Sequence, residues 1–340
     1  MGCPDWPKCF GTWIPPTEAS QLPTNYKEVY TAQRVAKNQK LARTLQKMGF
    51  AQVAGSIFAN PTQYIETDFN PVKTWIEYLN RVLGALIGVF VFATVVCARP
   101  YWRRDRPVFW LALASFLLTG VQGWLGSLVV STNLLPVMVT IHMGLALVIV
   151  ALLLYAVDRA RWGGAGVTTG IAVQAPVFAN ASGQVPGRGL SVWLWASLLL
   201  TFWQIVLGTQ VREQVDTVSA AVGYAGREAW LAQLGSVFST HRTVSALVLL
   251  LNVYVGYELW QLGSKRLRRL VIATLATIGL EIVAGIILAS FALPAVVQPI
   301  HLTLATGLFG VQFLTLLAVG RLSQRAKTLT PVGTPRQVVA

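Results

Sequence analysis

Long apolar runs, separated by short polar or basic segments, make up most of the chain. A helix that crosses the hydrocarbon core of a bilayer needs roughly 20 mostly apolar residues. Seven runs meet this length: 75–98, 107–130, 134–157, 191–211, 240–260, 270–293 and 295–320. The pattern predicts an all-α integral membrane protein with seven transmembrane helices.

Composition agrees with this prediction. Hydrophobic residues make up 54% of the 340 residues and charged residues only 12%, which is about half the charged share of a soluble domain. The net charge of +14 would suit a nucleic-acid partner if the basic residues formed one patch. They lie instead in short loops between apolar runs, a distribution that reports membrane orientation and excludes nucleic acid.

The basic residues also predict which side each loop faces. Connections 99–106, 159–188 and 265–269 and the C-terminal tail carry most of the arginines, whereas 131–140 and 291–300 carry no lysine or arginine. Short basic loops stay on the cytoplasmic side. We therefore expect a multi-pass protein of a bacterial cytoplasmic (inner) membrane, with a cytoplasmic C-terminus and an extracytoplasmic N-terminal segment.

These runs divide the chain into five parts: an extracytoplasmic segment 1–74, an N-terminal three-helix bundle 75–158, a Gly-rich cytoplasmic linker 159–190, a C-terminal four-helix bundle 191–320, and a cytoplasmic tail 321–340. Apolar residues recur at helical spacing within 26–50. We expect a surface helix there that covers the outer face, with docking of a partner as the alternative.

An internal repeat relates the two bundles. His142 and His301 each follow a proline at the start of a helix, and residues 20 and 16 positions before each are again similar: Gln122 and Glu281, Gly126 and Gly285. Asn80-Arg81 precedes His142 by about the distance at which His241-Arg242 precedes His301. The repeat predicts two pseudo-symmetric helical bundles that run parallel, which disfavours a transporter with inverted repeats.

His241 and His301 are the strongest candidates for a bound group. Both fall near the extracytoplasmic ends of their helices, so both can lie at one depth. A zinc site would need three or four ligands, and no such cluster exists in the sequence. Two axial imidazoles across a helical bundle suit a haem iron, with Arg242 placed to pair with a propionate. The alternative is that the histidines are interhelical hydrogen-bonding residues.

The equivalent positions in the N-terminal half are Asn80 and His142, with Arg81 as the corresponding propionate contact. This pair is weaker, because asparagine is a poor iron ligand. Glu281 is a carboxylate in the middle of an apolar helix, for which we favour pairing with a neighbouring polar group over a role as proton carrier.

Five segments resemble haem A synthase: GCPDWPKC at 2–9, EYLNR at 77–81, His142, THR at 240–242 and PIH at 299–301. The resemblance runs over nearly the whole chain, and its most specific part is CPDW followed by the acidic helix ending in Arg81. It implies an eight-helix protein of two four-helix bundles that oxidises the C8 methyl of haem O to a formyl group.

The resemblance also implies roles for individual residues. His241 and His301 become axial ligands of a haem b cofactor, and His142 faces the iron of the substrate haem. Glu77 lies beside the substrate as the catalytic residue. Cys3 and Cys9 match a pair that can form a disulfide, although two cysteines so spaced can equally remain thiols.

Two features depart from the family. The family's helix before CPDW has no counterpart in this sequence, which gives three helices in the first bundle and four in the second, and we expect the further helix to be encoded upstream of Met1. Asn80 stands where the family has a second histidine, which leaves the substrate haem with one protein imidazole.

The predicted function is therefore an oxidoreductase that makes haem A from haem O, with haem b as cofactor. The alternative is a non-catalytic bis-histidine membrane cytochrome or haem carrier. The implied partners are haem O, haem O synthase, an electron donor that the sequence does not identify, the lipid bilayer and a second copy of the chain.

Overall fold

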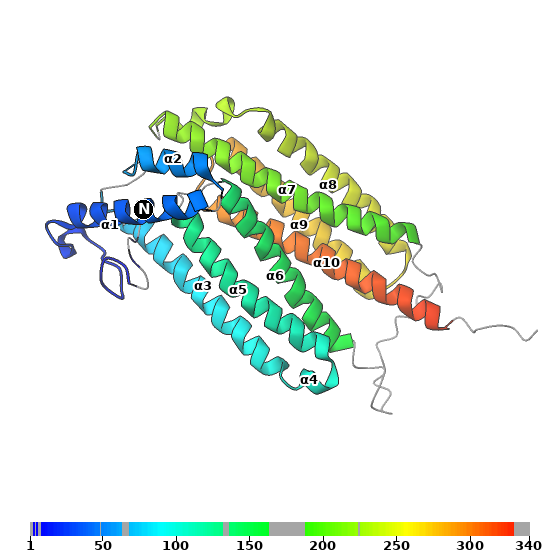
Figure 1. Cartoon of the computed structure of the whole chain (residues 1–340). Coiled ribbons are helices and arrows are strands. Elements are labelled where there is room, and N and C mark those ends of the chain that lie inside the picture. The colour runs from blue at the N-terminus through cyan, green and yellow to red at the C-terminus, as the bar shows by residue number, and fades with distance from the viewer. Residues whose placement is uncertain are drawn as a thin grey trace, which may run out of the picture. The chain divides into compact units, whose positions relative to one another are not determined.

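The computed structural model describes residues 3, 5, 8–47, 49–62, 68–131, 136–162, 188–223 and 225–329. Most of the predicted linker, the end of the tail, and Pro4 and Trp6 of the CPDW motif lie outside these residues. In the described part the regular structure is helical (Figure 1). The main helices are α1 (Tyr26–Lys47), α2 (Ala51–Ala59), α3 (Pro71–Ala98), α4 (Tyr101–Arg104), α5 (Arg106–Ser131), α6 (Pro136–Trp162), α7 (Arg188–Ala221), α8 (Ser236–Gln261), α9 (Lys265–Ser290) and α10 (Val297–Leu329).

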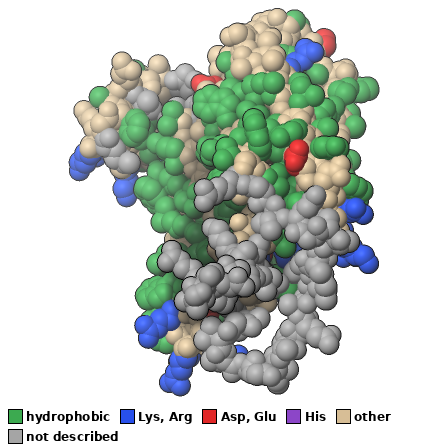
Figure 2. Space-filling model, turned by 90° about the vertical axis from the view of Figure 1, so that its right-hand side faces the viewer, with side chains coloured by type: hydrophobic (Ala, Val, Ile, Leu, Met, Phe, Trp, Pro, Cys, Tyr) green, Lys and Arg blue, Asp and Glu red, His purple; other side chains and the backbone are tan. Residues whose placement is uncertain are grey.

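Seven of these helices, α3 and α5 to α10, are long and apolar enough to cross a membrane. This confirms the predicted fold class. Their outward faces are strongly apolar: Phe90 of α3 is 68% exposed and Leu250 of α8 is 65% exposed. Hydrophobic side chains cover much of the face seen in Figure 2, whereas lysine and arginine lie toward its margins. Such a surface is suited to contact with lipid.

Two helix boundaries differ from the prediction for local reasons. Helix α3 begins at Pro71, four residues before the apolar run, because the Asn70 side chain accepts a hydrogen bond from the Lys73 amide and caps the helix. Helix α7 continues ten residues beyond 211, with an Arg212–Asp216 ion pair one turn apart in the extension. Apolarity alone does not report such polar helical turns.

The chain forms two compact units: Met1–Pro100 with Ala112–Ala146 (unit 1), and Tyr101–Leu111 with Leu147–Ala340 (unit 2). In unit 1, α1 packs against α2. Leu41, Ala42 and Leu45 of α1 are buried together with Ala54 of α2 and Met138 of α6. The polar segment thus forms a surface helix that covers the start of α6 within this unit.

In unit 2, α7 packs against α8, α8 against α9, α9 against α10, and α10 against α7. These four contacts close a four-helix bundle in which α8 and α10 occupy opposite corners. Its core includes an apolar cluster that takes residues from all four helices, among them Leu194, Val255, Val271 and Val319.

A buried polar triad lies within the same bundle. The Ser197 hydroxyl donates to Asn252 Oδ1 at 2.9 Å, and Gln312 Nε2 donates to both partners at 3.1 and 3.0 Å. All three side chains are at most 4% exposed. The triad joins α7, α8 and α10, and hydrogen bonds of this kind hold helices together where lipid supplies no hydrophobic driving force.

Ion pairs connect helices at the end of unit 2 where α6 and α10 finish and α9 begins. Asp158 of α6 is buried and forms ion pairs with Arg266 of α9 and Arg321 of α10. Both guanidinium groups also lie over the Trp162 ring, at 5.2 and 5.6 Å from its centre. A buried carboxylate requires such partners, so this cluster fixes the ends of three helices.

Candidate functional site

The two histidines of unit 2 lie at one end of its bundle, which we call the histidine end. His241 is in the second turn of α8 and His301 in the second turn of α10. Because α8 and α10 are at opposite corners, the two side chains can approach each other across the bundle. Seven residues further along each helix, Val248 of α8 and Leu308 of α10 belong to one buried cluster. His241 and His301, the pair predicted from the sequence, thus lie at the same end of one bundle.

A glycine of the preceding helix lies at the edge of each ring. A Cβ added at Gly208 of α7 would lie 3.4 Å from Cε1 of His241, and one at Gly285 of α9 would lie 3.8 Å from Cε1 of His301. The first fully buried residues of α8 and α10 come seven positions after each histidine, at Val248 and Leu308. Glycine at the ring edges and a core that starts deeper suit a flat ligand between the helices.

The ring nitrogens also suit a haem. On His301, Nδ1 lies 2.6 Å from Glu281 Oε2, which leaves Nε2 as the nitrogen for a metal. Nδ1 of His241 is buried without a hydrogen bond among the described residues. No group of three or more metal-ligating side chains occurs in the described part of the chain, which does not suit zinc. Two facing imidazoles fit the axial positions of a haem iron.

Gln204 and Gly208 belong to this site but were not selected from the sequence. Gln204 Nε2 donates to the backbone carbonyl of His241 at 3.0 Å. The two residues have the same spacing as Gln122 with Gly126 and Glu281 with Gly285. That recurring four-residue spacing is the signal in the sequence that points to Gln204 and Gly208.

Two arginines lie at the histidine end. Arg242 follows His241 and is exposed, with its guanidinium 5.8 Å from the centre of the Phe238 ring. Arg212 of α7 pairs with Asp216 and donates to Gln298, three residues before His301. Both are positioned to contact an anionic group at the mouth of the bundle.

In unit 1, His142 of α6 is held in the same way as His241. Gln122 Nε2 of α5 donates to the His142 carbonyl at 3.0 Å, and a Cβ at Gly126 would lie 3.3 Å from the His142 Cε1. Asn80 of α3 is exposed, and no hydrogen bond links it to His142 in the described residues. The structure therefore presents one imidazole here.

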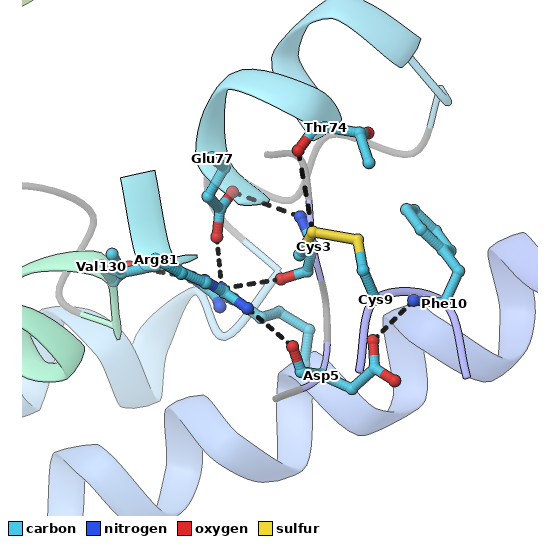
Figure 3. A network of polar contacts seen from close by, with 9 residues as sticks. Cys3, Asp5, Cys9, Phe10, Thr74, Glu77, Arg81 and Val130 are labelled. Atoms are coloured by element: carbon cyan, nitrogen blue, oxygen red, sulfur yellow. Dashed lines mark hydrogen bonds and ion pairs between the residues drawn. A yellow bond between two sulfur atoms is a disulfide. The ribbon is translucent and has the colours of Figure 1, made fainter. Parts of the chain in front are cut away.

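Glu77 lies in the polar network drawn in Figure 3. Its carboxylate pairs with Arg81, one turn further along α3, and accepts a hydrogen bond from the Cys3 amide at 3.2 Å. Arg81 also donates to the carbonyl oxygens of Asp5 and Cys3, at 2.7 and 3.2 Å. Both charged residues thus hold the N-terminal segment against α3, and Arg81 is engaged by protein groups.

That N-terminal segment is a closed loop. Cys3 and Cys9 are joined by a disulfide, and both are nearly fully buried. The Asp5 carboxylate accepts hydrogen bonds from the amides of Phe10 and Gly11, at 2.7 and 2.8 Å. Phe10 and Gly11 both have positive φ, so the Asp5 contacts stabilise a turn that ordinary residues disfavour.

A further arginine, Arg34 of α1, reaches the same network and was not selected from the sequence. Its guanidinium donates to the Val130 carbonyl at 3.2 Å. Burial lowers the pKa of Arg34, and the negative charge of Glu77 opposes this shift. Glu77 therefore pairs with the arginine of its own helix and also acts electrostatically on an arginine of the covering helix.

Comparison with known proteins follows this geometry. Residues 50–313 match the COX15-CtaA family, described as "Cytochrome oxidase assembly protein". A "Heme A synthase" of Shewanella oneidensis is 28% identical over 165 residues, which are 47% of this chain and 38% of that protein. The family match includes Glu77 and the three histidines and excludes α1 and the disulfide loop. Because the match covers well over half of the residues, the chain belongs to the COX15-CtaA family of cytochrome oxidase assembly proteins, the heme A synthase family.

Proposed function

We propose that this protein oxidises the C8 methyl group of haem O to a formyl group and so produces haem A. The observation that carries the proposal is the pair His241 and His301, on opposite corners of one bundle with glycine beside each ring. This arrangement fits a haem b cofactor in unit 2. Unit 1, with His142 and Glu77, is then left for the substrate.

In unit 2, His241 and His301 would hold the haem b iron, and Arg242 would pair with a propionate at the histidine end. Bound haem b supplies one-electron redox chemistry, which the side chains of the protein do not provide. Glycines lie at the ring edges, and Gln204 holds the backbone carbonyl of His241. The role of the bundle is thus to orient the cofactor and to keep it away from water.

In unit 1, His142 would face the iron of haem O, with its backbone carbonyl held by Gln122. Asn80 offers no imidazole, so a single histidine ligates the substrate, which suits a molecule that must leave after reaction. Glu77, between Arg81 and the Cys3 amide, would hold or accept a proton beside the methyl group as it is oxidised.

The proposal also covers the membrane in which the protein lies and the partners that it needs. The seven apolar helices place the protein in a membrane, and the basic connections favour a bacterial cytoplasmic membrane with the histidine end outside. Haem O synthase is the partner that would supply the substrate, and a separate donor must supply electrons. Association with a second copy of the chain is compatible with this arrangement.

The test is pigment extraction from the purified protein after co-expression with a source of haem O. Chromatography is expected to yield haem b together with haem A or a hydroxylated intermediate. The His301→Ala protein serves as the control, since it should give neither haem b nor haem A. Haem b without any haem A in the unmodified protein would contradict the oxidation and favour a cytochrome or haem carrier.

A further inference from the structure

One structural contact occurs three times in the chain, on the helix that precedes each histidine. A Gln or Glu and, four residues later, a glycine face the histidine of the next helix. The sets are Gln122, Gly126 and His142; Gln204, Gly208 and His241; and Glu281, Gly285 and His301. The glycine accommodates the ring edge in all three, so the remaining variable is the side chain four residues before it.

The third set differs in chemistry. Gln122 and Gln204 both donate their amide N–H to the backbone carbonyl of the histidine, at 3.0 Å. A carboxylate has no such donor. Glu281 Oε2 instead lies 2.6 Å from Nδ1 of the His301 ring, an ion-pair distance although the nitrogen is not aligned for a linear hydrogen bond. The His301 ring thus has a carboxylate neighbour that the other two rings lack.

The Glu281 carboxylate is mostly buried, and a buried carboxylate without a partner would destabilise the protein. The Glu281 side chain is 14% exposed, and α9 is an otherwise apolar spanning helix at this point. A carboxylate inside a membrane protein is stable only with a partner, and Nδ1 of His301 is the partner that the structure provides.

A carboxylate on one ring nitrogen has two effects on a histidine that binds metal through the other. It fixes the tautomer with hydrogen on Nδ1, which leaves the Nε2 lone pair for iron, and it raises the basicity of the ligand. A more basic axial ligand stabilises ferric over ferrous iron and lowers the midpoint potential.

We propose that Glu281 is a positioning residue that makes His301 the more strongly donating of the two haem b ligands and lowers the midpoint potential of the haem. The inference rests on the proposed binding of haem b by His241 and His301. It makes the two axial ligands unequal, with an amide-supported histidine on α8 and a carboxylate-supported histidine on α10.

The experiment uses the full chain purified with its haem. Glu281→Gln converts the third set to the chemistry of the other two. We expect it to keep haem b, to raise the midpoint potential in a spectroelectrochemical titration, and to raise the largest g value of the ferric low-spin signal. Gln204→Glu places a carboxylate at the matched position beside His241, and it should shift both quantities in the opposite direction. Leu280→Ala, at an exposed position next to Glu281 on α9, should leave both unchanged.

The outcomes separate the two proposals. If the unmodified protein contains no haem b, the proposed function fails whatever Glu281 does. If haem b is present but Glu281→Gln has the potential and g values of the unmodified protein, the inference is overturned. If Glu281→Gln binds no haem, the midpoint potential of the Gln204→Glu protein is the test. A potential equal to that of the unmodified protein overturns the inference.

Discussion

A histidine inside a membrane bundle is defined by what its ring contacts. His142, His241 and His301 are each in an early turn of a helix, and each has a glycine of the preceding helix at its ring edge. Only His241 and His301 belong to the same compact unit and lie at the same end of its bundle. These two therefore differ in expected role from His142, although the three local environments are similar.

This difference leads to a mutational prediction. His301→Ala or His241→Ala would remove one of the two proposed haem b ligands, and we expect either variant to lose the low-spin haem b spectrum. His142→Ala should retain at least most of that spectrum, because its ring belongs to the other unit. Absorption and haem quantification of the purified variants measure this. A normal low-spin spectrum in His301→Ala would contradict the ligand assignment.

Glu77 gives a second prediction. Glu77→Gln keeps one side-chain oxygen for the Cys3 amide but loses the charge that pairs with Arg81. We expect a loss of stability of about 1–2 kcal/mol at most, because the pair is partly exposed. Haem b should be unaffected, whereas oxidation should stop at haem O or a hydroxylated intermediate.

Asn80→His is the matched variant on the same helix, and it should change the spectrum of the substrate haem without stopping oxidation. Chromatography of extracted haems distinguishes the two variants. Full haem A production by Glu77→Gln would leave this residue as a structural acid that holds the disulfide loop.

At the residue scale, the sequence points to side chains that recur at fixed offsets and gives little sign of side chains that meet only by folding. The histidines were found because their offsets recur, and Glu281 was expected to pair with a polar neighbour. Its partner is His301. The contact of Arg34 with Val130 joins residues 96 positions apart, and no local pattern signals that.

At the scale of helices, the glycines of α7 and α9 allow each helix to approach a histidine ring closely, because they carry no side chain. A methyl group at Gly208 would be in ordinary van der Waals contact with His241, at 3.4 Å. We expect Gly208→Ala to be tolerated and Gly208→Leu to displace the ring and reduce haem b content several-fold. Gly279→Leu on α9 is the control, since a Cβ there has no neighbour within 4 Å. Equal haem content in Gly208→Leu and the unmodified protein would show that this glycine does not shape the site.

The triad of Ser197, Asn252 and Gln312 concerns how helices are held rather than what they bind. Asn252→Leu would remove the oxygen that accepts hydrogen bonds from both Ser197 and Gln312. The Gln312 amide would then lose one of its two acceptors. We expect a loss of about 1–3 kcal/mol in the free energy of unfolding, measured in detergent by thermal or denaturant unfolding. Leu250→Ala on the exposed face of α8 is the control, with a smaller expected loss. Similar losses in both variants would contradict a special role for the triad.

Helix existence followed from apolarity, while helix ends depended on polar residues. The break between α9 and α10 shows the physical reason. Ala292 and Leu293 adopt positive φ, and Pro294 follows, so the chain turns even though the apolar run continues. A window that counts apolar residues cannot locate such a turn, but the proline indicates its neighbourhood.

At the scale of the whole molecule, the distribution of arginine and the number of crossings together predict orientation. The seven helices alternate in direction if each spans the membrane. The ends of α3 and α10 then lie on one side, and the connection between α7 and α8 lies on the other. Arginines are concentrated in the first set of ends, which by the positive-inside rule faces the cytoplasm.

Cysteine labelling tests this orientation directly. Cys97, near the end of α3, is exposed and free, whereas Cys3 and Cys9 are joined in a disulfide. Glu228 lies exposed in the α7–α8 connection, and Glu228→Cys in a Cys97→Ser background gives a matched probe of the opposite side. With a membrane-impermeant maleimide on intact cells, we expect the Glu228→Cys protein to react and Cys97 to remain unlabelled. Inverted membrane vesicles should give the reverse. Labelling of Cys97 in intact cells would reverse the orientation and place the histidine end, with any haem held there, on the cytoplasmic side.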